Sequence, residues 1–289
     1  MPAGAEIRLL LFLLFLLFLL LPVTVTAATP GERARQIAGE VYFVNHFFAV
    51  DNISYGSKRK PMELINLPAG GKAQRYRLER HLNNVYDKGD IRALDLVIFR
   101  SGKLRSTGIL VDIYRDRKRP LSFAIWLPAL RKIRRHSEPD PADIWGGSIF
   151  TYGDIYLRRP EDENHTLLGK IRFPDCLGML DPVPDGLEPS CEARGKEVYH
   201  LRSVNRSANW WYDCRAEYYR DGKLIKVIDK DWRSMELADP RAQYWRYWYG
   251  RDLRSGGEGL AWVKEGQVSW NDRVSRNLWS LATLRKLSR

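Results

Sequence analysis

The spacing of apolar residues divides the chain into an early helical segment and a long series of strands. Across residues 32–50, apolar side chains recur at every third or fourth position, at Ile37, Val41, Val44 and Phe48. This spacing predicts an amphipathic helix. His46 lies within it and is expected to be a partly buried structural histidine. Residues 51–71 are rich in turn formers and are interpreted as a connection.

Beyond residue 71, apolar and polar positions alternate with a period of two, which is typical of strands. The expected strands cover residues 75–78, 94–98, 109–113, 122–127, 243–249 and 259–270, the last broken at Glu265-Gly266. Residues 212–220 and 223–228 flank Asp221-Gly222, which is the strongest short signal for a β-hairpin.

The succession of strands without intervening helices predicts the fold class. We expect a mainly β protein with a few helices (α+β), built on one strongly curved antiparallel sheet in a single domain over residues 28–289. The concave face of such a sheet must be filled by a helix, a second sheet or a ligand. The early amphipathic helix is one candidate for this role.

The N-terminus carries a pattern typical of export. Residues 9–21 are all Leu or Phe, which is shorter than the ~20 apolar residues of a membrane span. Arg8 precedes the run, and Val25-Thr26-Ala27 fits a cleavage site. We predict a signal peptide over residues 1–27, cleaved near Ala27, and a periplasmic protein; a retained anchor is the alternative. No Cys follows the run, so a lipoprotein is not expected.

Composition and charge narrow the partners. The chain has 289 residues, of which 44% are hydrophobic, so disorder is excluded as its main state. The 47 Lys and Arg exceed the 35 Asp and Glu and give a net charge of +12, which by itself suggests nucleic acid, an anionic membrane or an anionic ligand. For an exported protein we expect no nucleic-acid partner, and instead lipid headgroups, anionic glycans or a protein.

The three cysteines would lie in an oxidising compartment after export. Cys176 and Cys191 flank a loop rich in Pro and Gly and form the expected disulfide. Cys214, on an expected strand, is the candidate for a buried free thiol, and pairing of Cys191 with Cys214 is the alternative. The cysteines have no catalytic or metal-binding spacing.

Positive charge is concentrated after the strand at 122–127. Arg131, Lys132, Arg134 and Arg135 follow the apolar residues Trp126, Leu127 and Leu130, and residues 115–135 hold eight Lys or Arg and one acid. This stretch is predicted to dock lipid headgroups, at ~1 kcal/mol for each basic residue, or an acidic partner. The alternative is a solvated basic turn whose leucines pack into the core.

Two further patterns have both a functional and a structural interpretation. After Gly146-Gly147, a strand is predicted in which Phe150, Tyr152 and Asp154 share one face. Asp154 could pair with one of the upstream arginines. Eight of the ten Trp lie at or after position 210; they would line a groove for acyl chains or sugars, or form cross-strand pairs. Alternation places Trp245 with Tyr247 on one face and Trp248 on the other.

The two motifs around residues 126–155 resemble a known family. WLPALRKIRR at 126–135 and GSIFTYGDI at 147–155 are similar, in order and spacing, to motifs of the outer-membrane lipoprotein-sorting protein-like family, the LolA-like domains. Ile149 and Gly153 stand where that family usually carries acids. The resemblance implies an incomplete curved antiparallel β-barrel with helices over its concave face and an apolar cavity. It also implies a partner of the resistance-nodulation-division (MMPL) type of inner-membrane exporter.

These observations predict a periplasmic, monomeric and non-catalytic carrier for acyl chains of lipids or lipoproteins, without cofactor or metal. Trp126, Leu127, Leu130, Phe150 and Tyr152 are the candidate cavity or mouth residues. The headgroup or partner docking set comprises the four basic residues and Asp154. Neither G-x-S-x-G nor HExxH occurs in the sequence. Two alternatives stay open: an envelope scaffold or exporter subunit without cargo, and a glycan-active enzyme that uses Asp154.

Overall fold

The computed structural model describes residues 28–85, 89–157, 159–205 and 214–286. The predicted signal peptide, residues 1–27, lies outside this part of the chain. The first described element is helix α2, Pro30–Asn45. Thr29 and Glu32 form a capping box at its start, which satisfies free backbone N–H groups. The helix ends five residues before the predicted boundary, because Phe47 takes a left-handed φ of 55°.

The described strands form one large antiparallel sheet and one separate hairpin. In the large sheet the order is β10-β11-β12-β13-β2-β3-β4-β5-β6-β7, and β1 pairs with β3 and β14. Its strands are β1 (Asn52–Tyr55), β2 (Met62–Leu67), β3 (Gln74–Asn83), β4 (Ile91–Phe99), β5 (Gly108–Tyr114), β6 (Ser122–Leu127), β7 (Lys132–His136), β10 (Arg215–Arg220), β11 (Lys223–Ser234), β12 (Gln243–Asp252), β13 (Gly257–Trp262) and β14 (Val268–Trp270). The hairpin consists of β8 (Glu163–Arg172) and β9 (Glu197–Asn205).

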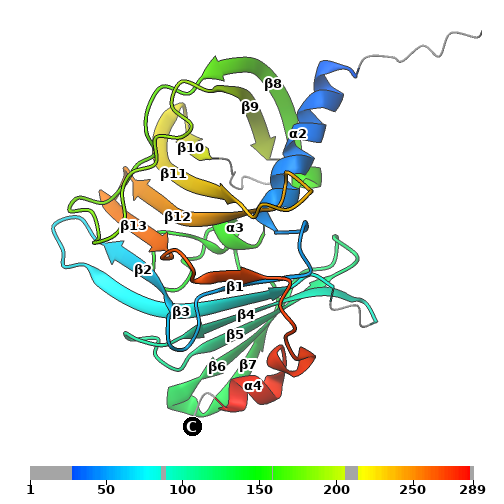
Figure 1. Cartoon of the computed structure of the whole chain (residues 1–289), viewed down its shortest axis with the longest axis vertical. Helices are drawn as coiled ribbons and strands as arrows, with labels where there is room; N and C mark the ends of the chain where they lie inside the picture. Colours follow the sequence, from blue (N-terminus) through cyan, green and yellow to red (C-terminus); the bar gives the residue numbers. More distant parts are fainter. Residues whose placement is uncertain (1–27, 86–88, 158, 206–213, 287–289) are drawn as a thin grey trace, which may run out of the picture.

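The predicted fold class is confirmed: the sheet is antiparallel, curved and open, with β10 and β7 at its two ends (Figure 1). The predicted hairpin is also confirmed over β10 and β11, with Arg220 opposite Lys223. Residues 212 and 213 of its predicted first strand lie outside the described residues. Asp221 and Gly222 both have positive φ, 50° and 74°, as the tightest hairpin turns require.

Three segments differ from prediction. Residues 51–71, expected to be a connection, contain β1 and β2, which pair with successive halves of β3. The predicted strand through Phe150 and Asp154 is instead helix α3, Tyr152–Ile155, capped by Thr151. The basic residues after β6 form a strand, because the short helix η1 (Pro128–Leu130) and a left-handed Arg131 reverse the chain onto β6.

A bulge in the β11–β12 pair changes the faces of the tryptophans. Asp231 pairs with Tyr247, but Trp232 pairs with Trp245, so Arg246 is an extra residue on β12. An extra residue shifts the alternation by one. Trp245 and Trp248 therefore belong to the same core cluster, while Tyr247 belongs to another, and the predicted grouping of Trp245 with Tyr247 is wrong.

Both faces of the sheet are covered. The largest core cluster receives Trp145, Phe150 and Tyr156 from the segment around α3, together with inward residues of the strands. The opposite face of β4–β6 packs against the C-terminal residues. Trp279, between η3 (Arg276–Leu278) and α4 (Leu281–Lys286), and Leu284 of α4 supply apolar side chains there. Another short helix, η2, spans Pro160–Asp162.

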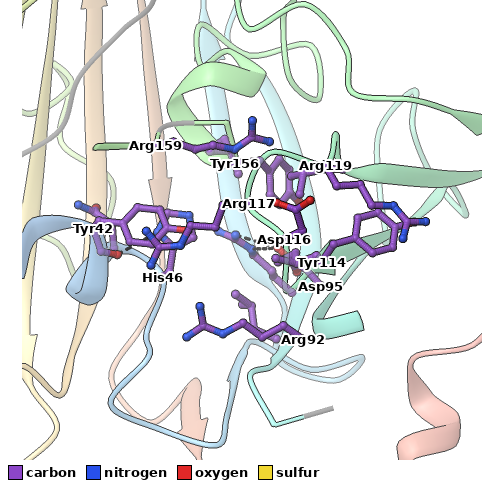
Figure 2. Close-up of a pocket in the computed structure, with 16 residues that line it drawn as sticks. Tyr42, His46, Arg92, Asp95, Tyr114, Asp116, Arg117, Arg119, Tyr156 and Arg159 are labelled. Atoms are coloured by element: carbon purple, nitrogen blue, oxygen red, sulfur yellow. Dashed lines mark hydrogen bonds and ion pairs between the residues drawn. The ribbon is translucent and has the colours of Figure 1, made fainter. Parts of the chain in front are cut away.

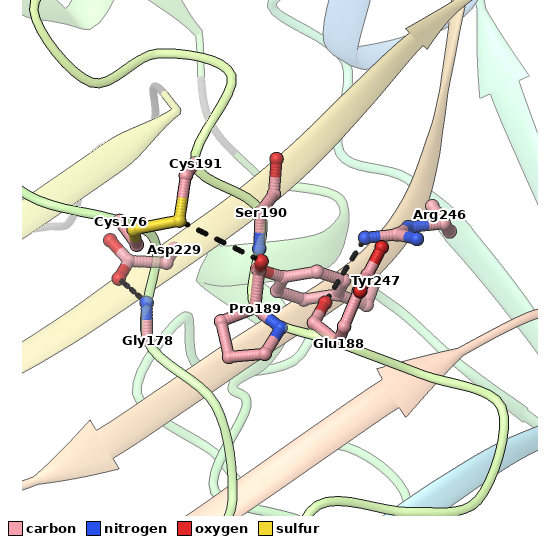
Figure 3. The surroundings of a disulfide bond; sticks show 9 residues. All are labelled: Cys176, Gly178, Glu188, Pro189, Ser190, Cys191, Asp229, Arg246 and Tyr247. Atoms are coloured by element: carbon pink, nitrogen blue, oxygen red, sulfur yellow. Dashed lines mark hydrogen bonds between the residues drawn. A yellow bond between two sulfur atoms is a disulfide. The ribbon is translucent and has the colours of Figure 1, made fainter.

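The loop between β8 and β9 covers the outer face of β12 and β13. Cys176 and Cys191 form a disulfide across this loop, as predicted. Gly178 N donates a 2.6 Å hydrogen bond to Asp229 Oδ2, and Ser190 N donates a 3.0 Å bond to the hydroxyl of Tyr247 (Figure 3). The two hydrogen bonds attach the loop to β11 and β12, and the disulfide joins two parts of the loop to each other.

Candidate functional site

The main feature is a cavity of about 1630 Å³ between α2, the β8–β9 hairpin and the end strand β10. Pockets for small ligands usually measure ~300–1,000 Å³, so this one has room for a bulkier molecule. Its apolar lining comprises Ile37, Val41, Val44, Leu168, Ile171, Phe173, Val198, Leu201, Val204, Ala216, Tyr218 and Trp232.

Each wall follows from a local sequence pattern. Ile37, Val41 and Val44 lie four and three residues apart and so share one face of α2. The hairpin contributes apolar side chains that are unusually exposed, with Leu168 at 52% and Val204 at 51%. Exposed apolar patches of this kind mark binding surfaces.

The wall formed by β10 is fixed by a buried ionic network. The hydroxyl of Tyr218, a lining residue, donates a 2.9 Å hydrogen bond to Asp154 Oδ1. Lys226 of β11 forms an ion pair with the other oxygen, which also accepts a 2.7 Å bond from Thr151 N. Asp154 is 1% exposed, so its predicted place in a docking surface is wrong. Its partner is Lys226, not an upstream arginine.

The polar rim of the cavity is balanced in charge. Its arginines are Arg202, Arg215, Arg220 and Arg254, and its acids are Glu40, Glu197, Glu217 and Asp221. Ser203 also lines the cavity, and its Oγ lies 2.9 Å from Nδ1 of the buried His165. Because the lining arginines and acids are equal in number, we expect apolar contact to dominate binding here.

The predicted cavity residues lie elsewhere. Trp126 is buried in the cluster beneath α4, and Phe150 is buried in the largest core. Tyr152 packs partly buried against that same core, Leu127 is half-buried and Leu130 is 52% exposed beside β7. None of the five lines the large cavity. The assignment was wrong because the hairpin that builds the cavity follows the two motifs in sequence.

The basic stretch is exposed but is not at the cavity mouth. Arg131, Lys132, Arg134 and Arg135 are exposed on and next to β7, and no ion pair to them occurs among the described residues. β7 lies at the opposite end of the molecule from β8 and β9 (Figure 1). These residues therefore do not lie beside the large cavity, as their proximity to the predicted mouth residues in the sequence had suggested.

A second, much smaller cavity of about 40 Å³ lies at the C-terminal end of α2 (Figure 2). Tyr42, Asn45 and His46 line it together with arginines from other elements. Burial lowers the pKa of His46 to about 4, and its Nδ1 lies 2.9 Å from the carbonyl oxygen of Tyr42. His46 is therefore neutral at pH 7, in keeping with the structural role predicted for it.

The described residues also bear on other kinds of feature, namely metal ligands, a reactive thiol and a membrane-spanning helix. No group of three or more His, Cys, Asp or Glu in these residues could hold a metal ion. Cys214, one residue before β10 and not on it, lines the large cavity and is half-buried. Within the described residues, no helix has the length and apolar character needed to cross a bilayer.

No protein-family model and no curated protein matches this chain. Among solved structures, it is similar to a DUF1329 family protein from Desulfovibrio piger, with 14% identity and a TM-score of 0.65 over 89% of this chain and 100% of that one. It is also similar to a structure described as an outer membrane lipoprotein-sorting protein domain from Vibrio parahaemolyticus, with 16% identity and a TM-score of 0.64 over 88% of this chain and 99% of that one. A LolA superfamily protein from Nitrosomonas europaea aligns at a TM-score of 0.47 with 16% identity over 89% of this chain and 100% of that one. The chain therefore has the fold of the outer membrane lipoprotein-sorting domain, which is the fold that its two motifs implied.

Proposed function

We propose that the protein is a periplasmic, non-catalytic carrier that binds acyl chains of lipids or lipoproteins and passes them between components of the envelope. The observation that carries this proposal is the large cavity, with its volume of about 1630 Å³ and its apolar walls. The lipoprotein-sorting description of one structural neighbour agrees with it.

The expected affinity suits a carrier that must release its cargo. Burial of an acyl chain contributes ~0.8 kcal/mol per methylene, so about 12 buried methylenes supply roughly 10 kcal/mol. Association costs ~4 kcal/mol or more. The difference, about 6 kcal/mol or less, corresponds to a Kd of roughly tens of micromolar or weaker.

The test compares two leucines of equal exposure. Leu168 lines the cavity and Leu130 does not, yet both side chains are 52% exposed. We expect Leu168→Asp to weaken the binding of a fluorescent fatty-acid probe about tenfold or more, because it places a charge in the apolar wall. Leu130→Asp should change the affinity less than twofold. Equal effects of the two variants, or no probe binding by the delipidated protein, would refute the carrier.

The proposed location rests on two features. The Leu/Phe run at residues 9–21 fits an export signal, and the Cys176–Cys191 disulfide fits an oxidising compartment. We expect the mature protein isolated from the periplasm to begin at Ala28, which mass spectrometry of its N-terminal peptide will determine. A mature chain that still contains residues 9–21 would indicate an anchor.

A second candidate function is favoured by the exposed basic residues at β7. An envelope scaffold, or an accessory subunit of an MMPL-type exporter, would use this edge to dock an acidic partner without carrying cargo. Charge reversal of Arg131, Arg134 and Arg135 to Glu should then abolish co-purification of the exporter from detergent-solubilised envelopes, while the wild type binds no acyl probe. Probe binding by the wild type, with the exporter complex unaffected by charge reversal, would exclude the scaffold.

A further inference from the structure

Among the residues that line the small cavity of Figure 2, cations outnumber anions, whereas the two are equal in number in the lining of the large cavity. Five arginines and two aspartates line it: Arg80, Arg92, Arg117, Arg119 and Arg159, with Asp95 and Asp116. They come from four separate parts of the chain, namely β3, β4, the β5–β6 turn and the segment after α3. Collecting so many cations around one hollow is electrostatically unfavourable unless anions compensate for them.

Four of the five arginines have carboxylate partners. Both Nε and Nη2 of Arg80 contact Asp95 Oδ2, at 2.9 and 2.8 Å. The remaining ion pairs are Arg159 with Glu138 at 2.7 Å, Arg117 with Glu161, and Arg119 with Asp90. The last two are on the surface, where ion pairs contribute little and exchange readily.

Arg92 differs from the other four. No carboxylate within the described residues forms an ion pair with it, and its guanidinium lies 4.1 Å from the ring centroid of Phe48. A similar contact holds Arg117 at 4.9 Å over Tyr42. Stacking of a guanidinium on an aromatic ring orients the group and leaves its N–H edge available to planar or tetrahedral anions.

A buried hydroxyl completes the lining. Tyr156 is 7% exposed. The guanidinium carbon of Arg80 lies 5.3 Å from the centroid of the Tyr156 ring. Burial and the neighbouring Asp95 carboxylate raise the pKa of Tyr156 well above its usual value. Its hydroxyl therefore stays protonated at pH 7 and is able to donate a hydrogen bond.

We propose that this cavity binds a phosphate-type anion, as the headgroup of the lipid whose acyl chains occupy the large cavity. Asn45 lines both cavities, so the two adjoin at the end of α2, and we place the phosphate in the small cavity and the acyl chains in the large one. The inference rests on the carrier function proposed above and specifies its cargo as an anionic phospholipid. Arginine is suited to the role because its fork of N–H groups contacts two phosphate oxygens at once.

The size of the cavity agrees with a headgroup and excludes a chain. A water molecule needs ~10–15 Å³ of such volume, so about 40 Å³ is room for roughly three waters. Three phosphate oxygens could take their places, whereas an acyl chain could not enter.

The test uses two fluorescent probes with the same acyl chains, phosphatidic acid and diacylglycerol, and two variants that each remove one positive charge. Arg92→Gln alters the cavity and leaves none of the described carboxylates unpaired. Arg134→Gln, on β7, is the matched control, since Arg134 also has no ion-pair partner among the described residues and lines neither cavity. Thermal unfolding of both variants checks that the fold is intact.

For phosphatidic acid we expect Arg92→Gln to raise the Kd about tenfold, which is about 1.4 kcal/mol, and Arg134→Gln to change it less than twofold. Diacylglycerol affinity should be the same in all three proteins. Arg92→Lys keeps the positive charge but loses the fork of N–H groups, so its Kd for phosphatidic acid should lie between those of the wild type and Arg92→Gln. Equal losses for both lipids, or no loss for phosphatidic acid, would overturn the headgroup site.

Calorimetry with inorganic phosphate distinguishes the source of the anion. Displacement of phosphatidic acid by excess phosphate in the wild type supports the anion site. Phosphate binding that depends on Arg92, without any preference between the two lipids, would overturn the lipid headgroup in favour of a free anion. If neither probe binds at all, the carrier function fails, while the dependence of phosphate binding on Arg92 still decides whether the anion site exists.

Discussion

Asp154→Asn should be among the most destabilising single substitutions in this protein, because it removes the charge that neutralises a buried lysine. The carboxylate is 1% exposed and Lys226 is 4% exposed. The substitution keeps the size of the side chain but leaves Lys226 without its counter-charge. Breaking a buried pair in this way costs ~3–5 kcal/mol, out of a total stability of ~5–15 kcal/mol for a typical domain.

Urea unfolding followed by tryptophan fluorescence measures this loss. The urea concentration at the midpoint of unfolding should fall, while the dependence of the unfolding free energy on urea concentration should stay unchanged. The informative comparison is the double variant Asp154→Asn with Lys226→Met. Removing both charges together should restore most of the stability, because the double variant leaves no unpaired buried ion. The reasoning is refuted if Asp154→Asn costs less than about 1 kcal/mol, or if the double variant loses the sum of the two single effects.

The pKa of His46 is lowered to about 4, so the unfolded chain takes up a proton at this histidine at higher pH than the folded protein does. The free energy of unfolding should therefore fall by up to about 3 kcal/mol as the pH is lowered from 6.5 to 4. His46→Gln should remove that part of the pH dependence. Replacing Cys176 and Cys191 by Ser should cost roughly 3 kcal/mol for a sequence separation of 15, measured by urea unfolding; an unchanged midpoint would show that the loop is held by its hydrogen bonds alone. The purified wild type should hydrolyse acyl esters no faster than the uncatalysed reaction, and Ser203→Ala should show the same rate. Hydrolysis by the wild type that Ser203→Ala abolishes would contradict a non-catalytic carrier.

Much of the fold is readable in the sequence, because short-range patterns specify it. Alternation over residues 122–127 predicts β6 with the bounds that the structure has, and Asp221-Gly222 specifies a turn that few other dipeptides can form. Cys176 and Cys191 are paired as their positions around one loop suggested. Residues 51–71 were misinterpreted because β1 and β2 are short and are stabilised mainly by pairing with β3, a contact that no local window contains.

The candidate sites depended on contacts that local patterns do not record. Phe150 and Trp126 have the aromatic character of a binding surface, yet the sheet and α4 bury them in cores. The large cavity was not predicted, because the exposed Leu168 and Val204 become a wall only when the β8–β9 hairpin lies beside α2. A signal existed in the apolar residues of that hairpin, but nothing in it indicates which side faces a cavity.

By itself, the sequence determined the period of the strongly patterned elements such as α2 and β6, the turn chemistry, the pattern typical of an export signal and the density of charge on residues 131–135. Each of these depends on neighbours along the chain. Only the tertiary structure decided which charges are buried and which are exposed. It pairs Asp154 with Lys226 inside the protein and leaves Arg134 in solvent at an end strand. It also brings Arg92 to the hollow at the end of α2. The physical reason is that the free energy of a charge depends on its solvation and its partners, and both are set by segments far apart in the chain.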